Sequence, residues 1–410
     1  PDGLRVVSAI VDGTVNVWDV QDFHAPKRIF ARARDENRID GHSGFVTCAA
    51  FSPDGQWLAT ACGRDKSVIV WDVAQGEILQ KLSFEDRVES VSWHPDGVRM
   101  VVREGTYIIQ NIGEDGVVLD GRGDEFHPVI LSGYLGERAV LTSDGKVNVP
   151  IQVHGRYGIV ENLVVASDRE VKYDIIVTGD NAIVRNCVFF GPVHEDCIKI
   201  GDQADHCFLF NNDVSGYGSQ CVDNFGINIL FRKNHVHHAG NWKANAFGTK
   251  GGTRSVVVAS NVFHDLSGGI NFGGTGNLDL YRRDREGNLL HATTDPVAVN
   301  NTFYKIVGPA VDFQSCLNGV FEGNTIHELA AGFRVGLAPE QFEGEWKELV
   351  VGLPATRGTV IHNNRLADIA GNAMFLVEER AREGLVAGGN TYYTDGEPVF
   401  LLGPRKLTLE

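Results

Sequence analysis

The sequence predicts an all-β protein in which two repeat architectures follow one another. The first observation is a Pro-Asp-Gly turn that recurs 42 residues apart within the first hundred residues. The second is an asparagine that returns between short apolar strands, mostly every 22 to 27 residues, through the rest of the chain. The third is a count of 48 glycines, as turn-rich β structure requires. Short strands in fixed periods are typical of stacked repeat folds.

The N-terminal repeat has a recognisable motif. Pro-Asp-Gly occurs at Pro1–Gly3, Pro53–Gly55 and Pro95–Gly97, and the segments Asp12–Val20 and Asp65–Val73 read DGTVNVWDV and DKSVIVWDV. These features resemble the WD-repeat β-propeller family over residues 1–102. The resemblance implies a partial propeller of two to three blades: the end of one blade, one full blade and the start of a third. Propellers close with about 4 to 8 blades.

The same resemblance implies which residues stabilise the blades. In that family a histidine, an aspartate and a tryptophan form a hydrogen-bond network, which would use His42, Asp65 and Trp71 in the full blade. Asp12 and Trp18 would serve the preceding blade. These residues are structural in the family, and the blades would dock a protein partner. Open edges leave three alternatives: blades that precede Pro1, a fragment, or blades that pack on their neighbour.

The remainder, residues 103–410, is predicted to be a β-solenoid. Residues 103–121 read equally well as a last blade strand or as the first solenoid turn, so we place the boundary near 103. Because each turn repeats one sharp bend, the recurring asparagines should stack at one corner about 4.8 Å apart, where the amide bonds backbone groups. We interpret them as architectural; they are Asn162, Asn186, Asn212, Asn234, Asn261, Asn301, Asn324, Asn364 and Asn390.

Composition excludes several classes of protein. A formal net charge of -16 argues against a nucleic-acid partner. No apolar run reaches the roughly 18 to 20 residues that a membrane span needs. Seven cysteines occur without a CxxC motif, so no disulfide network is expected. Cys197 and Cys221 open equivalent strands and should stack inside the coil. The chain begins at Pro1, so a signal peptide would lie upstream, and localisation is unknown from the residues alone.

An exposed strand after each asparagine corner alternates apolar and polar residues, as in Ile198–Lys199–Ile200 and Val311–Asp312–Phe313. Alternation sends the apolar side chains into the coil and the middle one outward. We therefore predict an outward column that would bind a polar polymer or simply form a solvated face. Its members are Lys199, Asp223, either Gly248 or Lys250, Asn271, Asp312 and Arg334.

Two insertions, Thr275–Asp295 and Leu337–Thr356, leave the coil after this same strand. Insertions at one corner commonly build a binding wall in repeat proteins. Arg282 and Trp346, among their aromatic and basic residues, are suited to carboxylate binding and sugar stacking. Ordinary surface loops are the alternative interpretation.

The segment Asn245–Gly274 and the earlier EGTY and GVVLDG stretches resemble right-handed parallel β-helices of the polysaccharide-lyase type, close to alginate lyases and chondroitinase B. That resemblance implies a right-handed parallel β-helix, a catalytic lysine base at Lys250 and a Ca²⁺ cofactor. It also implies a secreted or cell-envelope protein. Where the family has an arginine, this chain has Asn271 and Phe272; the nearest outward arginine is Arg334. Lys199, two turns away, is expected to be too distant to lower the pKa of Lys250 strongly.

Two further clusters are candidates for metal binding or catalysis. Asp180 and Asp202 both follow glycine, 22 residues apart, and with Glu195 on a neighbouring turn they would offer oxygen ligands to calcium. A repeated Asx turn is the alternative.

Histidines are concentrated in the stretch NHVHHAGNW, where His235 and His237 should share a face. A transition-metal site there has no supporting motif of the HExxH kind. His238, just before the Lys250 strand, is a second candidate for catalysis, as an acid or an orienting group.

These observations favour a carbohydrate-active β-helix protein that binds and cleaves an acidic polysaccharide by β-elimination. A glycoside hydrolase needs two carboxylates roughly 5 to 9.5 Å apart. Asp223 and Asp312 lie too far apart for that reaction, whereas Asp180 and Asp202 could meet the distance but show no other sign of catalysis. A non-catalytic protein, with an interaction module and a glycan-binding solenoid, is the alternative from another class.

Overall fold

In a computed structural model, the described residues are 3–9, 14–21, 28–30, 41–52, 54–83, 88, 91, 98–109, 116–120, 123–126, 128–143, 148–167, 171–191, 193–239, 245–274, 281–336, 352–370, 373–395, 399–402 and 405–407. They form two compact units, Pro1–Val171 and Lys172–Glu410. Nearly all elements are strands, so the prediction of an all-β protein is confirmed. No helix in the described ranges is long and apolar enough to cross a membrane.

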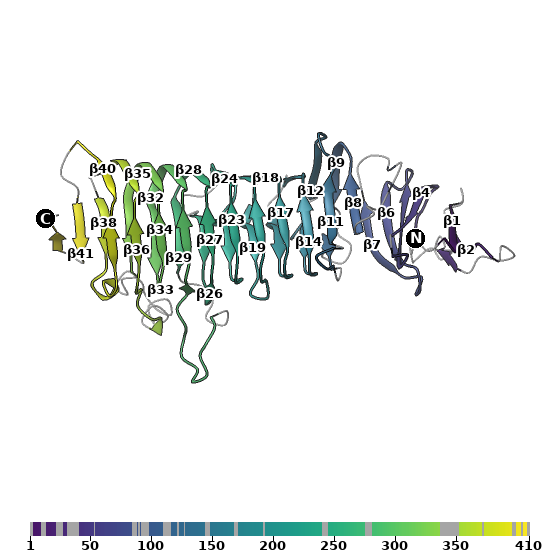
Figure 1. The fold of residues 1–410 in the computed structure, drawn as a ribbon. Coiled ribbons are helices and arrows are strands. Elements are labelled where there is room, and N and C mark those ends of the chain that lie inside the picture. The colour runs from purple at the N-terminus through teal and green to yellow at the C-terminus, as the bar shows by residue number, and fades with distance from the viewer. Residues whose placement is uncertain are drawn as a thin grey trace. The chain divides into compact units, whose positions relative to one another are not determined.

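The first unit begins with two antiparallel sheets (Figure 1). One has three strands: β1 (Arg5–Ala9), β2 (Val15–Asp19) and β3 (Arg28–Phe30). The other has four: β4 (Val46–Phe51), β5 (Trp57–Cys62), β6 (Ser67–Asp72) and β7 (Ile78–Ser83). One apolar core joins the two sheets. It includes Leu58, Ile69 and Trp71 from the four-stranded sheet and Val15 and Val17 from β2. The four-stranded sheet is the complete blade that the sequence predicted.

The rest of the first unit is parallel. Its strands are β8 (Val98–Val102), β9 (Gly105–Ile109), β10 (Val117–Leu119), β11 (Val129–Gly133), β12 (Ala139–Ser143), β13 (Ile151–Val153), β14 (Gly158–Glu161) and β15 (Val164–Ala166). β8 pairs in parallel with β11, and β9 with β12. Val98–Val102, which the repeat spacing assigned to a third blade, therefore lies in the coil instead. Among the described strands it pairs with β11, and it forms the edge of an eleven-stranded parallel sheet.

The second unit is a parallel coil with three faces, seen as successive turns in Figure 1. The lysine face comprises β16 (Val171–Val177), β19 (Val193–Ile200), β22 (Gln220–Asn224), β25 (Asn245–Thr249), β29 (Gly268–Gly273), β38 (Ala373–Val377) and β41 (Val399–Leu402). The histidine face comprises β18 (Val188–Phe190), β21 (Asp213–Ser215), β24 (His235–His237), β28 (Val262–Leu266), β37 (Arg365–Ile369) and β40 (Thr391–Tyr393).

The back face comprises β17 (Ile183–Arg185), β20 (Phe208–Phe210), β23 (Leu230–Arg232), β27 (Val257–Ala259), β31 (Val297–Val299), β34 (Val320–Glu322), β36 (Val360–His362) and β39 (Val386–Gly388). Two long strands, β32 (Thr302–Gln314) and β35 (Thr325–Val335), run through both the histidine and the lysine faces. Short elements complete the unit: β26 (Thr253–Arg254), β30 (Thr293–Thr294), β33 (Cys316–Leu317), the 3-10 helix η4 (Glu379–Ala381) and β42 (Arg405–Leu407).

The predicted asparagine ladder is present from Asn212 to Asn390. Each amide nitrogen donates to the amide oxygen one turn on, as from Asn261 to Asn301 at 2.9 Å and from Asn301 to Asn324 at 3.0 Å. The same nitrogen also reaches a backbone carbonyl one turn back, which for Asn261 is that of Phe231 at 3.0 Å. From Asn212 to Asn364 these residues are buried, so the ladder supplies hydrogen bonds that water cannot.

The ladder differs from the prediction in one respect. Asn162 and Asn186 have left-handed backbones, with φ of 56° and 54°, whereas the left-handed residue of the next turn is Asn211, one position before the ladder amide of Asn212. Asn186 accordingly aligns with Asn211, to which it is hydrogen bonded at 2.8 Å. Two neighbouring positions at one bend both favour asparagine, one for its backbone and one for its amide, and the sequence alone does not separate them.

The interior of the second unit is apolar. Stacked phenylalanines, among them Phe263 and Phe303 with ring centroids 5.0 Å apart, fill it from turn to turn. Cys197 and Cys221 are fully buried, and all seven cysteines are free thiols. Both expectations for the cysteines are confirmed.

Candidate functional site

The lysine face gathers two lysines around one carboxylate. In the register of this face, Lys199 on β19 lies beside Asp223 on β22, and Asp223 lies beside Gly248 on β25. The ammonium of Lys199 contacts Oδ2 of Asp223, and Nζ of Lys250, just after β25, lies 3.1 Å from Oδ1. Asp223 therefore bridges two cationic side chains that come from different turns.

A second carboxylate belongs to the same cluster. Oδ2 of Asp196 lies 3.7 Å from Nζ of Lys199, so one ammonium group links Asp196 and Asp223. Burial and the neighbouring Asp223 carboxylate raise the pKa of Asp196 to about 7. We call Asp196, Lys199, Asp223 and Lys250 the lysine cluster.

Whether Lys199 lowers the pKa of Lys250 stays a prediction. Their strands are two turns apart, and each flexible side chain reaches to the strand between them and ends at Asp223. Sequence reasoning did not choose Asp196 as a site residue. The signal that could have found it is an acid directly before the buried run Cys197–Ile198 on the same strand.

An aromatic ring and a glycine shape this cluster. The Phe225 ring lies under both ammonium groups, with its centroid 4.6 Å from Nζ of Lys199 and 5.7 Å from Nζ of Lys250. A Cβ at Gly248 would meet Oε1 of Gln220 at 1.5 Å. Gln220 donates in turn to Asp223 at 3.3 Å. The outward position on β25 is thus Gly248, which leaves room for Gln220, and Lys250 enters from the strand end.

The other residues of the outward column, Asn271, Asp312 and Arg334, are less exposed to solvent than the alternation of the sequence predicted. Asp312 is paired with Arg334 on the next strand, whose Nε lies 2.7 Å from Oδ2, and its side chain is only 5% exposed. Burial raises the pKa of Asp312. Oδ1 of Asp312 and Oδ1 of its neighbour Asn271 are buried without hydrogen-bond partners. The pair Asp312–Arg334 is too far along the column to join the lysine cluster, two strands beyond Gly248.

The insertions contribute differently from the prediction. Arg282 donates to the carbonyl oxygens of Gly252 at 3.1 Å and Asp202 at 3.0 Å, so its guanidinium is engaged by the backbone of the coil. Tyr281 is buried beside Leu353 from the second insertion. Trp346 lies outside the described residues.

The acidic residues predicted to bind calcium do not gather. In the described parts of the chain, no group of three potential metal ligands includes Asp180, Asp202 or Glu195. Glu195 accepts a hydrogen bond from the Tyr173 hydroxyl at 2.8 Å and lies 3.8 Å from Nζ of Lys172.

His238 lies on the histidine face rather than with Lys250. Its Nδ1 is 2.6 Å from Nδ1 of His237, and its Nε2 is 3.8 Å from Asp265. His235 and His237 share one face of β24, as predicted, with ring centroids 4.3 Å apart.

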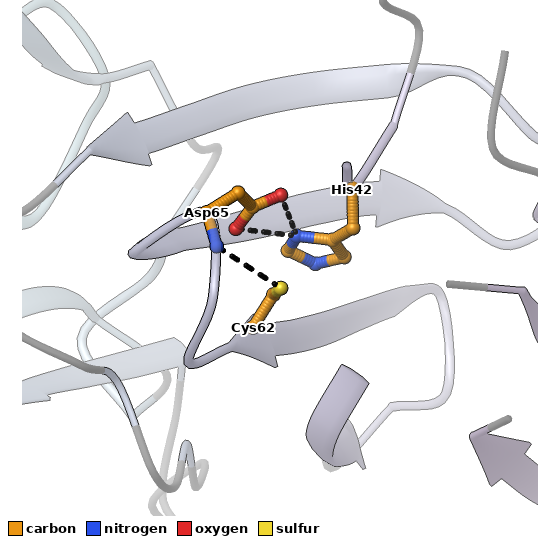
Figure 2. A group of neighbouring side chains, drawn as sticks. All are labelled: His42, Cys62 and Asp65. Atoms are coloured by element: carbon orange, nitrogen blue, oxygen red, sulfur yellow. Dashed lines mark hydrogen bonds and ion pairs between the residues drawn. The ribbon is translucent and has the colours of Figure 1, made fainter. Parts of the chain in front are cut away.

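The blade network implied by the WD-repeat resemblance is present in the first unit. His42 Nε2 and Trp71 Nε1 each lie 2.8 Å from the Thr60 hydroxyl, and His42 Nδ1 lies 3.2 Å from Asp65. Figure 2 shows the imidazole of His42 turned toward the Asp65 carboxylate, with Cys62 at the backbone nitrogen of Asp65. Because His42 is already hydrogen bonded on both nitrogens, this group is a structural network rather than a metal centre. Asp12 lies outside the described residues, and Trp18 bonds Ser8 at 2.8 Å.

Replacing Thr60 by valine should destabilise the first unit. The change keeps the shape of the side chain but removes the oxygen that His42 and Trp71 share, and each buried polar group left without a partner costs about 1 to 3 kcal/mol. The free energy of unfolding, from denaturant titration, should fall by roughly 2 to 4 kcal/mol. Thr47→Val, at an exposed threonine, is the control and should change it by less than about 1 kcal/mol. Equal losses in the two variants would contradict the network.

The comparisons with known proteins match a WD repeat in the first unit. Residues 35–72 match the family model described as WD domain, G-beta repeat. The rice protein "Small ribosomal subunit protein RACK1y" (Oryza sativa subsp. japonica) is 29% identical over 96 residues, which are 23% of this chain and 25% of that protein. "Protein groucho" of Drosophila melanogaster is 32% identical over 97 residues, 24% of this chain and 12% of its own.

Among solved structures, the Myceliophteria thermophila Cps50 (Swd1) β-propeller domain is 30% identical over 23% of this chain and 26% of its own, with a TM-score of 0.19. The chain thus spans about a quarter or less of the relatives it matches. The N-terminal region of this protein therefore contains a WD repeat, and a parallel coil follows it.

Proposed function

We propose that the second unit is a carbohydrate-active solenoid that binds an acidic polysaccharide along the lysine face and cleaves it at the lysine cluster. The observation on which this rests is the pair of carboxylates, Asp196 and Asp223, linked by Lys199. Glycan cleavage needs a proton donor and a base held close together, with pKa values that differ. A buried Asp196 with a pKa of about 7 is suited to donate a proton near neutral pH.

Charge within the cluster assigns the other roles. Asp223, in contact with two ammonium groups, would serve as the base or nucleophile. Lys199 and Lys250 retain part of their side-chain surface in solvent, 17% each. They would attract the carboxylates of the polymer, against the repulsion expected from a chain with a net charge of -16. This assignment favours hydrolysis of the glycosidic bond.

Cleavage by β-elimination is the second candidate. Lys250 favours it, because its side chain keeps part of its surface in solvent, where a lysine can act as the base of a proton-transfer step. In this route Lys250 removes the proton α to a uronate carboxylate, and Asp196 protonates the leaving oxygen. The contact between Lys250 and Asp223 opposes the route, since Nζ of Lys250 is already engaged by a carboxylate oxygen 3.1 Å away.

Calcium is not needed in either route. When the polysaccharide binds, the ammonium groups of Lys199 and Lys250 would neutralise its carboxylate. Calcium fills this role in the lyases that the sequence resembles. The described carboxylates of this face do not fit a calcium site, because Asp223 and Asp312 already contact cationic side chains. We therefore expect cleavage to persist in the presence of EDTA.

A panel of uronate polymers and neutral glycans tests the proposal. Hydrolysis should release reducing ends without ultraviolet absorbance, whereas β-elimination should also generate the absorbance of a 4,5-unsaturated product. Lys250→Ala should weaken binding and cleavage together if the lysine binds substrate carboxylates, and should abolish cleavage with binding retained if it is the base. Binding without any new ends would instead identify a non-catalytic glycan-binding module. The proposal fails if no acidic polymer binds or is cleaved.

The WD-repeat region suggests a partner for the first unit. We propose that its blades dock a protein, as repeat surfaces of this kind commonly do. Such docking would place the solenoid near its substrate, and it does not require that the solenoid be catalytic.

A further inference from the structure

The histidine face gathers imidazoles and carboxylates from three successive strands and the bends that follow them. Asp213 lies on β21, His235 and His237 lie on β24, and His264 lies on β28. The register places Asp213 beside His235 and His237 beside His264. His238 and Asp265 stand nearby with left-handed backbones, φ 50° and 54°, a conformation that His and Asp tolerate better than most residues. Neither unit's proposed function uses this cluster.

In both His235 and His264, a carboxylate is hydrogen bonded to Nδ1 of the imidazole. Asp213 Oδ2 lies 2.9 Å from Nδ1 of His235, and Asp265 Oδ2 lies 2.5 Å from Nδ1 of His264. An ionised carboxylate only accepts hydrogen bonds, so Nδ1 of each ring carries the proton. A neutral imidazole has a single N–H, which leaves a lone pair on Nε2 of both His235 and His264.

Those two lone pairs face one another. Nε2 of His235 and Nε2 of His264 are 2.7 Å apart. Two nitrogen lone pairs at that distance repel unless a cation lies between them, and that cation is either a proton or a metal ion. Carboxylate–imidazole pairs whose second nitrogen points at a common centre are the usual arrangement around a protein-bound metal, because the carboxylate fixes the ring and makes it more basic.

We propose that the histidine face binds one divalent transition-metal ion of the zinc class, with Nε2 of His235 and Nε2 of His264 as its first ligands. Asp213 and Asp265 orient these rings. Zinc–nitrogen bonds of about 2.0 Å place two ligand nitrogens about 3.3 Å apart in a tetrahedral site, so the rings need to separate by only a few tenths of an ångström. Imidazole donors suit zinc, copper and nickel rather than calcium or magnesium.

A second pair of imidazole nitrogens lies beside the first. Nε2 of His237 is hydrogen bonded to Oδ1 of Asp213 at 3.0 Å. Its other nitrogen, Nδ1, lies 2.6 Å from Nδ1 of His238. The ring centroids of His237 and His264 lie 5.2 Å apart, so the second pair is adjacent to the first. His264 is buried with a side chain only 10% exposed, whereas His235 is 43% exposed, which gives an ion access from one side.

Metal titration of the full chain tests this site. After treatment with EDTA and dialysis, Zn²⁺ should bind in a ratio of one per chain in calorimetry, and Co²⁺ should give the visible absorption bands of a nitrogen-coordinated ion. His235→Gln with His264→Gln should weaken Zn²⁺ binding at least about tenfold, and Asp213→Asn or Asp265→Asn should weaken it about 10- to 100-fold. Thermal unfolding of the metal-free variants shows whether each remains folded.

His206→Gln is the matched control. His206 also pairs with a carboxylate, since its Nδ1 lies 2.7 Å from Oδ1 of Asp205. The substitution should leave the Zn²⁺ affinity unchanged. If the facing nitrogens share a proton instead, the metal-free protein takes up no Zn²⁺ at neutral pH, and the proposal is overturned. Zn²⁺ binding with wild-type affinity in the double variant overturns it equally, because the ion would then lie elsewhere. The outcome is independent of whether the lysine face cleaves a glycan.

Discussion

Replacing Asp196 by asparagine should abolish glycan cleavage while the protein stays folded. Asparagine retains the size of the side chain and its position near Lys199 but has no proton to donate to the leaving oxygen. Loss of a general acid typically lowers the rate by about 10²- to 10⁴-fold. The measurement is kcat from the release of reducing ends, with polymer binding followed separately. Asp223→Asn should produce a loss of similar size through the base, whereas Glu286→Gln on the distant hairpin should have no effect.

The pH dependence provides an independent check on Asp196. Because its pKa is raised to about 7, the donor form is lost above that pH, and cleavage should fall as pH rises through it. The stability of the fold should also depend on the protonation of Asp196. A carboxyl whose pKa is higher in the folded state than its usual 3.8 stabilises the fold below about pH 4, and this contribution disappears as pH rises through 7.

Wild-type protein should therefore lose thermal stability relative to Asp196→Asn over that interval. A variant with unchanged cleavage, or a difference in stability that does not vary with pH, would remove Asp196 from the mechanism.

Replacing Asn212 by alanine should cause the largest loss of stability. Its side chain donates to the carbonyl of Val184 and to the amide oxygen of Asn234, both at 3.0 Å, and accepts from the backbone nitrogen of Cys187 at 3.0 Å. The change takes away the acceptor of the buried Cys187 N–H and the donor to the Val184 carbonyl, each at a cost of about 1 to 3 kcal/mol, and it breaks the ladder bond to Asn234, whose oxygen keeps only the backbone N–H of residue 212. We expect the free energy of unfolding to fall by roughly 3 to 6 kcal/mol in denaturant titration.

The neighbouring Asn211 offers a matched control in the same bend. It has a left-handed backbone, φ 57°, and an exposed amide, so Asn211→Gly keeps the backbone conformation and removes only a surface contact. Its effect should stay below about 1 kcal/mol. If the two variants lose the same stability, the ladder is not what stabilises the coil.

Local patterns were sufficient where a feature repeats on every turn. Period-two alternation placed Lys199 and Asp223 at matching positions of adjacent strands, and the histidine spacing placed His235 and His237 on one face. The WD motif likewise predicted the bonds that join His42 and Trp71. In each case the relevant interaction is set by the distance along the chain within one strand or one repeat, and the same physical rule applies each time.

The sites were harder to predict because they depend on side-chain reach and burial between turns. Alternation left the outward position open between Gly248 and Lys250; Gly248 occupies it, and Lys250 reaches Asp223 from beyond the strand. Arg282 was expected to face a substrate and instead bonds carbonyls of the coil. The conformation of a long side chain depends on which neighbour can satisfy its charge, and that neighbour can be many residues away in the sequence.

The sequence by itself determined that this chain is all-β, that a WD repeat precedes a parallel coil, and that asparagines stack at one corner. Those properties follow from periodicity, which acts through the backbone and holds for every turn. Only the tertiary structure decided that Asp196, Lys199, Asp223 and Lys250 meet, and that two imidazole lone pairs face each other on the histidine face. Both clusters join residues from different turns, where electrostatic attraction and burial act through space and not along the chain.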